Sequence, residues 1–192
     1  MNLPNYLTLS RIALTFVVMA LLFVRNFTAA CAALVIFVVA CLTDLLDGWV
    51  ARKKGLISDF GKLMDPVADK VLVAGLFLTF VQLQLVGAWV VVVIIVREFL
   101  ITGMRILALR RGVVLAAENA GKHKTVSQMA AITLILIFLI LKESGLRFSF
   151  WNERWEAHFA AGIHIVVSVA VFFTLYSGIS YLWRNRGLIR TL

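Results

Sequence analysis

Long apolar runs separated by short polar stretches dominate the chain and predict its secondary structure. About six runs approach the ~20 apolar residues that a helix needs to cross a bilayer, at roughly 11–25, 28–52, 62–82, 87–110, 122–141 and 157–183. Residues 3–10 alternate apolar with polar side chains, which is typical of a segment lying along a membrane interface. The pattern predicts an all-α integral membrane protein with six transmembrane helices and a short N-terminal interfacial segment.

The region between Lys70 and Arg97 allows two interpretations, because it contains no charged residue. It could form one span, or two spans joined by a turn. Gln82, Gln84 and Gly87 make its strongest polar break, and such residues favour turns. Two spans also return the basic residues of 105–111 to the side that carries 52–54. We therefore predict two helices with a turn at 82–87.

The composition supports a membrane protein of one domain over residues 1–192. Hydrophobic residues make up 62% of the chain and the mean hydropathy is +0.97, well above the usual values for a soluble domain. No linker, repeat or low-complexity tract divides the sequence, and residues 2–10 lack the basic start of a cleaved signal peptide. The net charge of +9 falls between apolar runs, which favours topology signals, lipid headgroups or a phosphate-bearing substrate over nucleic acid.

The basic residues also predict the orientation. One side of the predicted helices collects most of the lysines and arginines, from residues 52–54, 62, 110–111, 122–124 and 184–190. The other side has Arg25 and the loop 142–156, whose three basic residues are matched by three glutamates. Because Lys/Arg-rich loops stay in the cytoplasm, we expect both termini and the polar stretch 44–69 to be cytoplasmic, at the inner or plasma membrane if the source is bacterial.

Four aspartates, at positions 44, 47, 65 and 69, interrupt the apolar pattern with helical spacing. Asp44 and Asp47 are three residues apart and Asp65 and Asp69 four, so each pair shares one helix face. A turn between them would let the two helices pack antiparallel and bring the carboxylates together. Carboxylates in apolar surroundings need a compensating charge, and all-oxygen ligation favours magnesium, manganese or calcium over zinc. Solvated aspartates at helix ends are the alternative interpretation.

The stretch Asp44–Asp69 matches D-x2-D-G-x2-A-R-x8-G-x3-D-x3-D without a gap, which resembles the motif of the CDP-alcohol phosphatidyltransferases. The resemblance implies a six-helix membrane enzyme, usually a homodimer, that transfers a phosphatidyl group from CDP-diacylglycerol to an alcohol and releases CMP. It implies two divalent metal ions, Mg²⁺ or Mn²⁺, on the four aspartates, with Asp69 also the general base on the acceptor hydroxyl. By motif position, the CDP-diacylglycerol site would include Asp47, Gly48, Ala51, Arg52 and Gly61.

Two further stretches resemble the phosphatidylglycerophosphate synthase branch of this family. Residues 4–11 are similar to its P-N-x-L-T-x-x-R and residues 121–128 to its G-K-x-K-T-x-x-Q. The resemblance implies glycerol 3-phosphate as the acceptor. Thr8 could close over the nucleotide together with Arg11, or the two could be a cap and an interface anchor.

A basic cluster near the fourth and fifth predicted helices could bind the acceptor. Arg105, Lys122 and Lys124 fall in the same cytoplasmic region, where three cations could receive the phosphate of glycerol 3-phosphate. The two lysines could instead be topology signals or headgroup anchors. Arg97 and Glu98 lie well inside the fourth helix, where unpaired charge is costly, so they form an internal ion pair or contact the active-site cavity.

Other functions fit less well. The same chemistry could use phosphatidylglycerol, serine or an inositol phosphate as acceptor, although serine has no phosphate to engage the basic cluster. A divalent-cation transporter could line its path with the aspartates, but these gather near one interface with no matching acidic set on the opposite side. A structural scaffold leaves the four aspartates unexplained.

Overall fold

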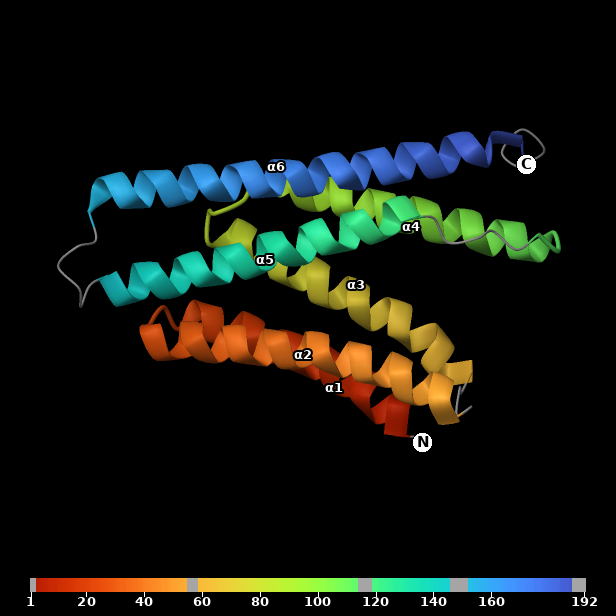
Figure 1. Cartoon of the computed structure of the whole chain (residues 1–192), viewed down its shortest axis with the longest axis horizontal. Helices are drawn as coiled ribbons and strands as arrows, with labels where there is room; N and C mark the ends of the chain where they lie inside the picture. The colour runs from red at the N-terminus through yellow and green to blue at the C-terminus, as the bar shows by residue number, and fades with distance from the viewer. Residues whose placement is uncertain (1–2, 55–58, 114–118, 146–151, 188–192) are drawn as a thin grey trace.

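The computed structural model describes residues 3–54, 59–113, 119–145 and 152–187. Within these ranges it leaves out the side chains of 3–5, 7, 44–54, 59–63, 65, 119–120 and 145. The described residues form six α-helices, which run through the bundle in Figure 1: α1 (Leu3–Phe23), α2 (Phe27–Lys54), α3 (Asp59–Gln82), α4 (Ala88–Arg110), α5 (Asn119–Gly145) and α6 (Glu153–Arg184). The predicted all-α architecture is confirmed.

The helix boundaries confirm the predicted turn at 82–87 and show how the N-terminal segment joins the first span. Helix α3 ends at Gln82 and α4 begins at Ala88, so the uncharged region forms two helices with the predicted turn. Residues 3–10 are joined to the first predicted span in one continuous helix, Leu3–Phe23, and their position along a membrane interface stays a prediction. Pro4 stands in the first turn, where its missing N–H costs no helical hydrogen bond, and no glycine or proline follows that would break the helix.

In the described part of the chain, helices α3 and α5 each pack against three other helices. The contacts of α3 are with α1, α4 and α5, and those of α5 are with α2, α3 and α6. Helix α2 also packs on α1, and α6 also packs on α4. The core between α3 and α5 consists of large, fully buried apolar side chains, among them Leu72, Leu76, Phe77, Ile132 and Ile135. This packing fixes the position of α3, which carries the second half of the aspartate motif.

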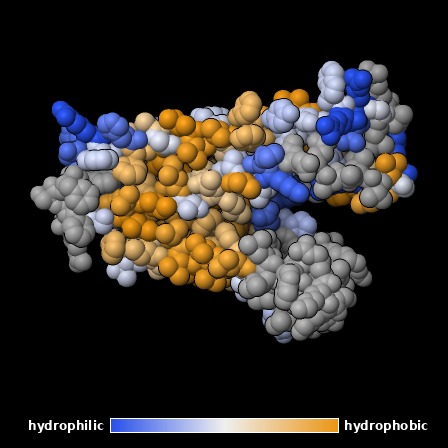
Figure 2. All heavy atoms as spheres, viewed as in Figure 1, coloured by the Kyte–Doolittle hydropathy of each residue, from blue (hydrophilic) through white to orange (hydrophobic). Residues whose placement is uncertain are grey.

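The outer surface of the bundle is also strongly apolar. Phe99 on α4 is 75% exposed, and Ile165 and Phe172 on α6 are 64% and 62% exposed. Figure 2 shows hydrophobic residues over the middle of one face, with hydrophilic residues toward its ends. Among the described residues, Gly121–Ser144 and Glu153–Arg184 are long and apolar enough to cross a membrane. Helices that are apolar all round belong in protein interiors or in lipid, so the structure is consistent with a membrane protein.

The two ends of the bundle differ in what they carry. At one end, which we call the motif end, α2 and α4 finish and α3 begins (Figure 1). At the other, distal end lie the turns between α1 and α2 and between α3 and α4. Arg25 and Gln84 in those turns adopt left-handed backbone conformations, with φ of 51° and 60°. The basic end of α4 therefore lies at the same end as the aspartate motif, as the two-span interpretation requires.

Candidate active site

The aspartate motif occupies the last turns of α2 and the first turns of α3. Asp44 and Asp47 lie on α2, and Asp65 and Asp69 on α3, so both pairs are helical as predicted. The two helices run antiparallel (Figure 1). Of the motif residues predicted to bind metal or nucleotide, most lie outside the described side chains, namely Asp44, Asp47, Gly48, Ala51, Arg52, Gly61 and Asp65. Their convergence on a metal pair stays a prediction.

The described side chains hold no group of three or more His, Cys, Asp or Glu residues that could bind a metal. Three of the four predicted ligands are outside that set. The remaining one, Asp69, is half-buried on α3. It is therefore the aspartate whose surroundings can be followed in the structure.

Asp69 lies between two cavities. The α4-side cavity, of about 420 Å³, lies among α3, α4 and α5, and its polar lining residues are Asp69, Lys70, Glu98, Thr102, Lys124 and Gln128. The α1-side cavity, of about 370 Å³, lies among α1, α2, α3 and α5, and it is lined by Arg11, Asp69 and Thr125 together with apolar residues of α2. One carboxylate thus borders two separate spaces.

A buried ionic cluster forms part of the wall of the α4-side cavity. The Lys124 ammonium donates to Oε1 of Glu98 at 2.6 Å, and Nη1 of Arg97 donates to the same oxygen at 2.9 Å. Lys124 is only 6% exposed. The internal ion pair predicted for Arg97 and Glu98 is therefore present, and it includes Lys124. Its two cations and one carboxylate leave a net positive charge in a region of low polarity.

Helix α6 contacts the ionic cluster at Arg97. Nη2 of Arg97 donates to Oγ of Ser177 at 3.1 Å, and the arginine stem passes so close to Gly178 that an added Cβ there would lie 3.1 Å from Cγ of Arg97. One face of α6 thereby contacts the cluster that borders the cavity. No motif in the sequence pointed to this part of the chain.

A second cation, Lys70, also lines the α4-side cavity. It follows Asp69 directly on α3, and its ammonium donates to Oγ1 of Thr102 on α4. No role was predicted for Lys70 from the sequence, although its position directly after the last aspartate of the motif could have indicated one. The hydrogen bond holds the lysine across the boundary between α3 and α4.

The three predicted acceptor residues are not equivalent in the structure. Lys124 lines the cavity beside Asp69, whereas Lys122 is exposed and borders neither cavity. Arg105 is also exposed and contacts Tyr181 on α6, with Nε 3.4 Å from the hydroxyl and the guanidinium carbon 5.6 Å from the ring centre. Of the three residues, only Lys124 lines a cavity that Asp69, the predicted general base, also lines.

The N-terminal motif contributes buried residues. Thr8 and Arg11 on α1 are 0% and 1% exposed, and Arg11 lines the α1-side cavity with Asp69. An anchor that reaches the membrane surface would be exposed. The burial of both residues favours the interpretation that places them inside the bundle, and Arg11 lies in the lining of a cavity that Asp69 also borders.

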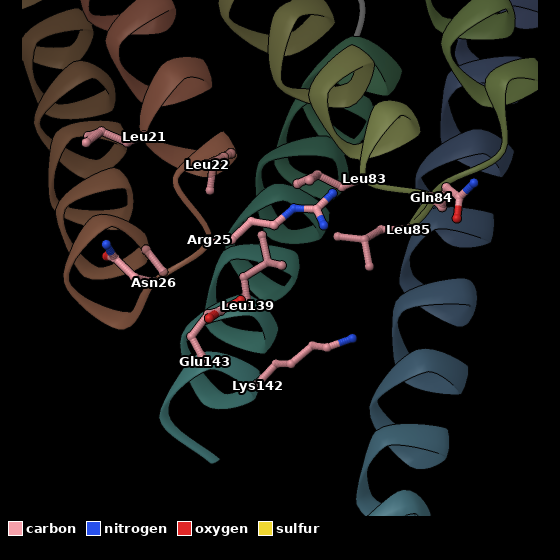
Figure 3. Close-up of a pocket in the computed structure, with 11 residues that line it drawn as sticks. Leu21, Leu22, Arg25, Asn26, Leu83, Gln84, Leu85, Leu139, Lys142 and Glu143 are labelled. Carbon is pink, nitrogen blue, oxygen red and sulfur yellow. The ribbon is translucent and has the colours of Figure 1, made fainter. Parts of the chain in front are cut away.

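A third cavity, of about 230 Å³, lies at the distal end of the bundle. Figure 3 shows Arg25, Lys142 and Glu143 around it, together with leucines from α1, the α3–α4 turn and α5. None of the predicted site residues lines it. The candidate chemistry of the described residues therefore belongs to the two cavities that meet at Asp69.

The comparisons with known proteins decide the family. The family model for CDP-alcohol phosphatidyltransferase matches residues 1–176. The chain belongs to the CDP-alcohol phosphatidyltransferase family. The match covers α1–α5 and α6 as far as residue 176. It ends one residue before Ser177, through which α6 contacts Arg97 of the ionic cluster.

Relatives in this family extend over nearly the whole chain. A CDP-diacylglycerol–glycerol-3-phosphate 3-phosphatidyltransferase from Bacillus subtilis (strain 168) is 36% identical over 99% of this chain and 98% of its own length. One with the same name from Rickettsia typhi is 34% identical, covering 94% of each chain. A probable phosphatidylglycerophosphate synthase from Mycobacterium tuberculosis is 35% identical over 95% of this chain and 81% of its own length.

Proposed function

We propose that this protein transfers the phosphatidyl group of CDP-diacylglycerol to glycerol 3-phosphate, giving phosphatidylglycerophosphate and CMP. Relatives with this activity in their names match the chain from end to end. The structural observation that carries the proposal is the position of Asp69, which borders both the α1-side and the α4-side cavity. A general base has to reach the acceptor hydroxyl at the place where this hydroxyl attacks the other substrate, and a carboxylate at the border of both cavities is suitably placed for that.

The α1-side cavity is the better position for the nucleotide end of CDP-diacylglycerol. It is lined by α2, the helix that carries Gly48, Ala51 and Arg52, and by Arg11 of α1. Glycine and alanine let a ligand approach the backbone closely, and arginine binds pyrophosphate oxygens through charged hydrogen bonds. Thr8 and Gly61 complete the proposed CDP-diacylglycerol site, together with Asp47.

The chemistry of the motif residues fits a pair of divalent cations. Asp44, Asp47, Asp65 and Asp69 would hold them, since carboxylates on two antiparallel helices provide the all-oxygen ligands that Mg²⁺ or Mn²⁺ prefers. Bound there, the metals would offset negative charge on the pyrophosphate. Asp69 would accept the proton of the acceptor hydroxyl, which is a poor nucleophile at neutral pH without a base.

The α4-side cavity is the better position for glycerol 3-phosphate. Lys124 supplies a buried ammonium beside Asp69, and a charged donor in a low-polarity wall binds phosphate more strongly than an exposed one. Lys122 and Arg105 are exposed, and we assign them a weaker, long-range attraction of the anionic substrate. This ranking refines the equal roles predicted from sequence.

The membrane arrangement follows from charge and fold together. We propose that residues 1–192 form a single domain in which all six helices cross the membrane, with the motif end and both termini in the cytoplasm. The clustering of Lys and Arg at that end supports the orientation. The family resemblance supports a homodimer. Both substrates would then meet at the cytoplasmic interface, where CDP-diacylglycerol presents its headgroup.

The proposal is tested by supplying the purified protein with CDP-diacylglycerol, Mg²⁺ and one acceptor at a time. The acceptors are glycerol 3-phosphate, phosphatidylglycerol, serine and an inositol phosphate, and CMP release is measured. We expect release that depends on glycerol 3-phosphate. Release with serine but not glycerol 3-phosphate would refute the acceptor assignment, and no release with any acceptor would refute the enzyme function.

A further inference from the structure

Helix α6 presents a row of buried small or polar residues to the other helices. Ser177, Gly178 and Tyr181 follow Thr174 by three, four and seven residues, so the four residues lie on one helix face. All four are buried, and Thr174, Ser177 and Tyr181 are at most 2% exposed. Among large apolar residues on the same helix, such a face is costly unless its polar groups have partners. It therefore indicates specific contacts.

Each polar group on this face contacts a polar residue of α4 or α5. Thr174 accepts a hydrogen bond from Nε2 of Gln128 at 3.0 Å, and Ser177 accepts one from Arg97 at 3.1 Å. Tyr181 contacts the guanidinium of Arg105. The face thus engages three side chains from the two helices that carry the proposed acceptor-binding cations.

The contact with Ser177 continues into the α4-side cavity. Arg97 donates to Oε1 of Glu98, and the same oxygen accepts from Lys124, which lines the cavity beside Asp69. Without Glu98 the long lysine side chain would have no fixed partner in this cluster, and rotamer freedom would oppose phosphate binding. Without Arg97 the carboxylate would cancel the lysine charge. Together they hold Lys124 and keep the cluster net positive.

We propose that Glu98 is a positioning residue for the acceptor, which holds Lys124 toward the phosphate of glycerol 3-phosphate. Glu98 is itself held by Arg97, which donates a hydrogen bond to Ser177 of α6. The inference rests on the proposed function, and it gives α6 a part in acceptor selectivity. Glu98 acts through Lys124 and touches neither reacting atom. Replacing Glu98 should therefore raise the KM for glycerol 3-phosphate and leave the KM for CDP-diacylglycerol unchanged.

The test compares Glu98→Gln, which keeps the side-chain size but removes the charge, with a matched control. The control is Glu156→Gln, because Glu156 pairs with Lys142 at the same 2.6 Å distance but at the distal end and half exposed. We expect Glu98→Gln to raise the KM for glycerol 3-phosphate about two- to 150-fold, the range of coupling between residues of one charged network. The KM for CDP-diacylglycerol should stay unchanged, and Glu156→Gln should change neither.

Two further variants separate positioning from a general loss of structure. Ser177→Ala is mild enough to keep the fold, and it should raise the same KM by a smaller factor. The double variant Glu98→Gln with Lys124→Ala should be no worse toward glycerol 3-phosphate than Lys124→Ala alone. Equal rises in both KM values, or tighter glycerol 3-phosphate binding in Glu98→Gln, would overturn the inference.

A binding readout keeps this inference separate from the proposed function. Inorganic phosphate should raise the Tm of the wild-type protein in detergent, and Glu98→Gln should require more phosphate for the same shift. An equal phosphate response in both proteins would overturn the role of Glu98. Wild-type protein that binds phosphate in this way but shows no turnover with glycerol 3-phosphate would refute the proposed function alone.

Discussion

Replacing Lys124 with alanine tests the acceptor site most sharply. The change removes the buried ammonium that lines the α4-side cavity beside Asp69. Glu98 would retain its 2.9 Å contact with Arg97, so its carboxylate is not left unpaired and the fold should survive. A hydrogen bond to a charged group contributes about 1.5–3 kcal/mol. At 1.36 kcal/mol for each factor of ten, kcat/KM for glycerol 3-phosphate should fall about 10- to 150-fold.

The assay measures initial rates of CMP release while each substrate is varied at a fixed concentration of the other. The KM for glycerol 3-phosphate should rise much more than the KM for CDP-diacylglycerol. Lys122→Ala is the matched comparison, because Lys122 lies two residues away on the same helix but is exposed. Its effect should be smaller. Equal effects of Lys124→Ala on both substrates would identify Lys124 as a headgroup anchor, and a larger effect of Lys122→Ala would refute the reasoning from burial.

Three further predictions concern the base, the metals and the packing of α6. Asp69→Asn should lower kcat about 100- to 10,000-fold, the usual contribution of a general base, with an unchanged circular dichroism spectrum; substantial remaining activity would exclude Asp69 as the base. Removing divalent cations with EDTA should stop CMP release, and excess Mg²⁺ or Mn²⁺ should restore it; full activity in EDTA would refute the metal proposal. Thr174→Val should leave the amide of buried Gln128 without its partner, at a cost of about 1–3 kcal/mol in the free energy of unfolding. The Tm of this variant in detergent should therefore be lower than the Tm of Thr133→Val, because the hydroxyl of Thr133 donates to a carbonyl of its own helix.

The fold could be predicted well from the sequence because its main signals are local. Apolar runs of helical length located every helix, and Gln82, Gln84 and Gly87 marked the turn between α3 and α4. The alternating polarity of residues 3–10 was interpreted as the sign of a position at the membrane interface. In the structure the polar residues Thr8 and Arg11 face the interior, and polarity alone does not distinguish a membrane interface from a buried polar site.

The candidate site was predictable only where its residues are close together in sequence. The aspartate motif of residues 44–69 identified Asp69, and the stretch 121–128 identified Lys124. The partners of Lys124 come from distant segments: Glu98 is 26 residues away in the chain, and Ser177 is 80 residues from Arg97. Ser177 and Thr174 are ordinary small polar residues in an apolar helix. Their roles depend on how α6 packs against α4 and α5, which no local pattern encodes.

The most direct test of the proposed function measures whether glycerol 3-phosphate is incorporated into lipid. Purified protein is incubated with CDP-diacylglycerol, Mg²⁺ and radiolabelled glycerol 3-phosphate, and the label in the organic extract is compared with CMP in the aqueous phase. We predict that labelled phosphatidylglycerophosphate and CMP form in equal amounts, and that Asp69→Asn slows the formation of both by the same factor, about 100 to 10,000. CMP released without label in the lipid would contradict the transfer to glycerol 3-phosphate.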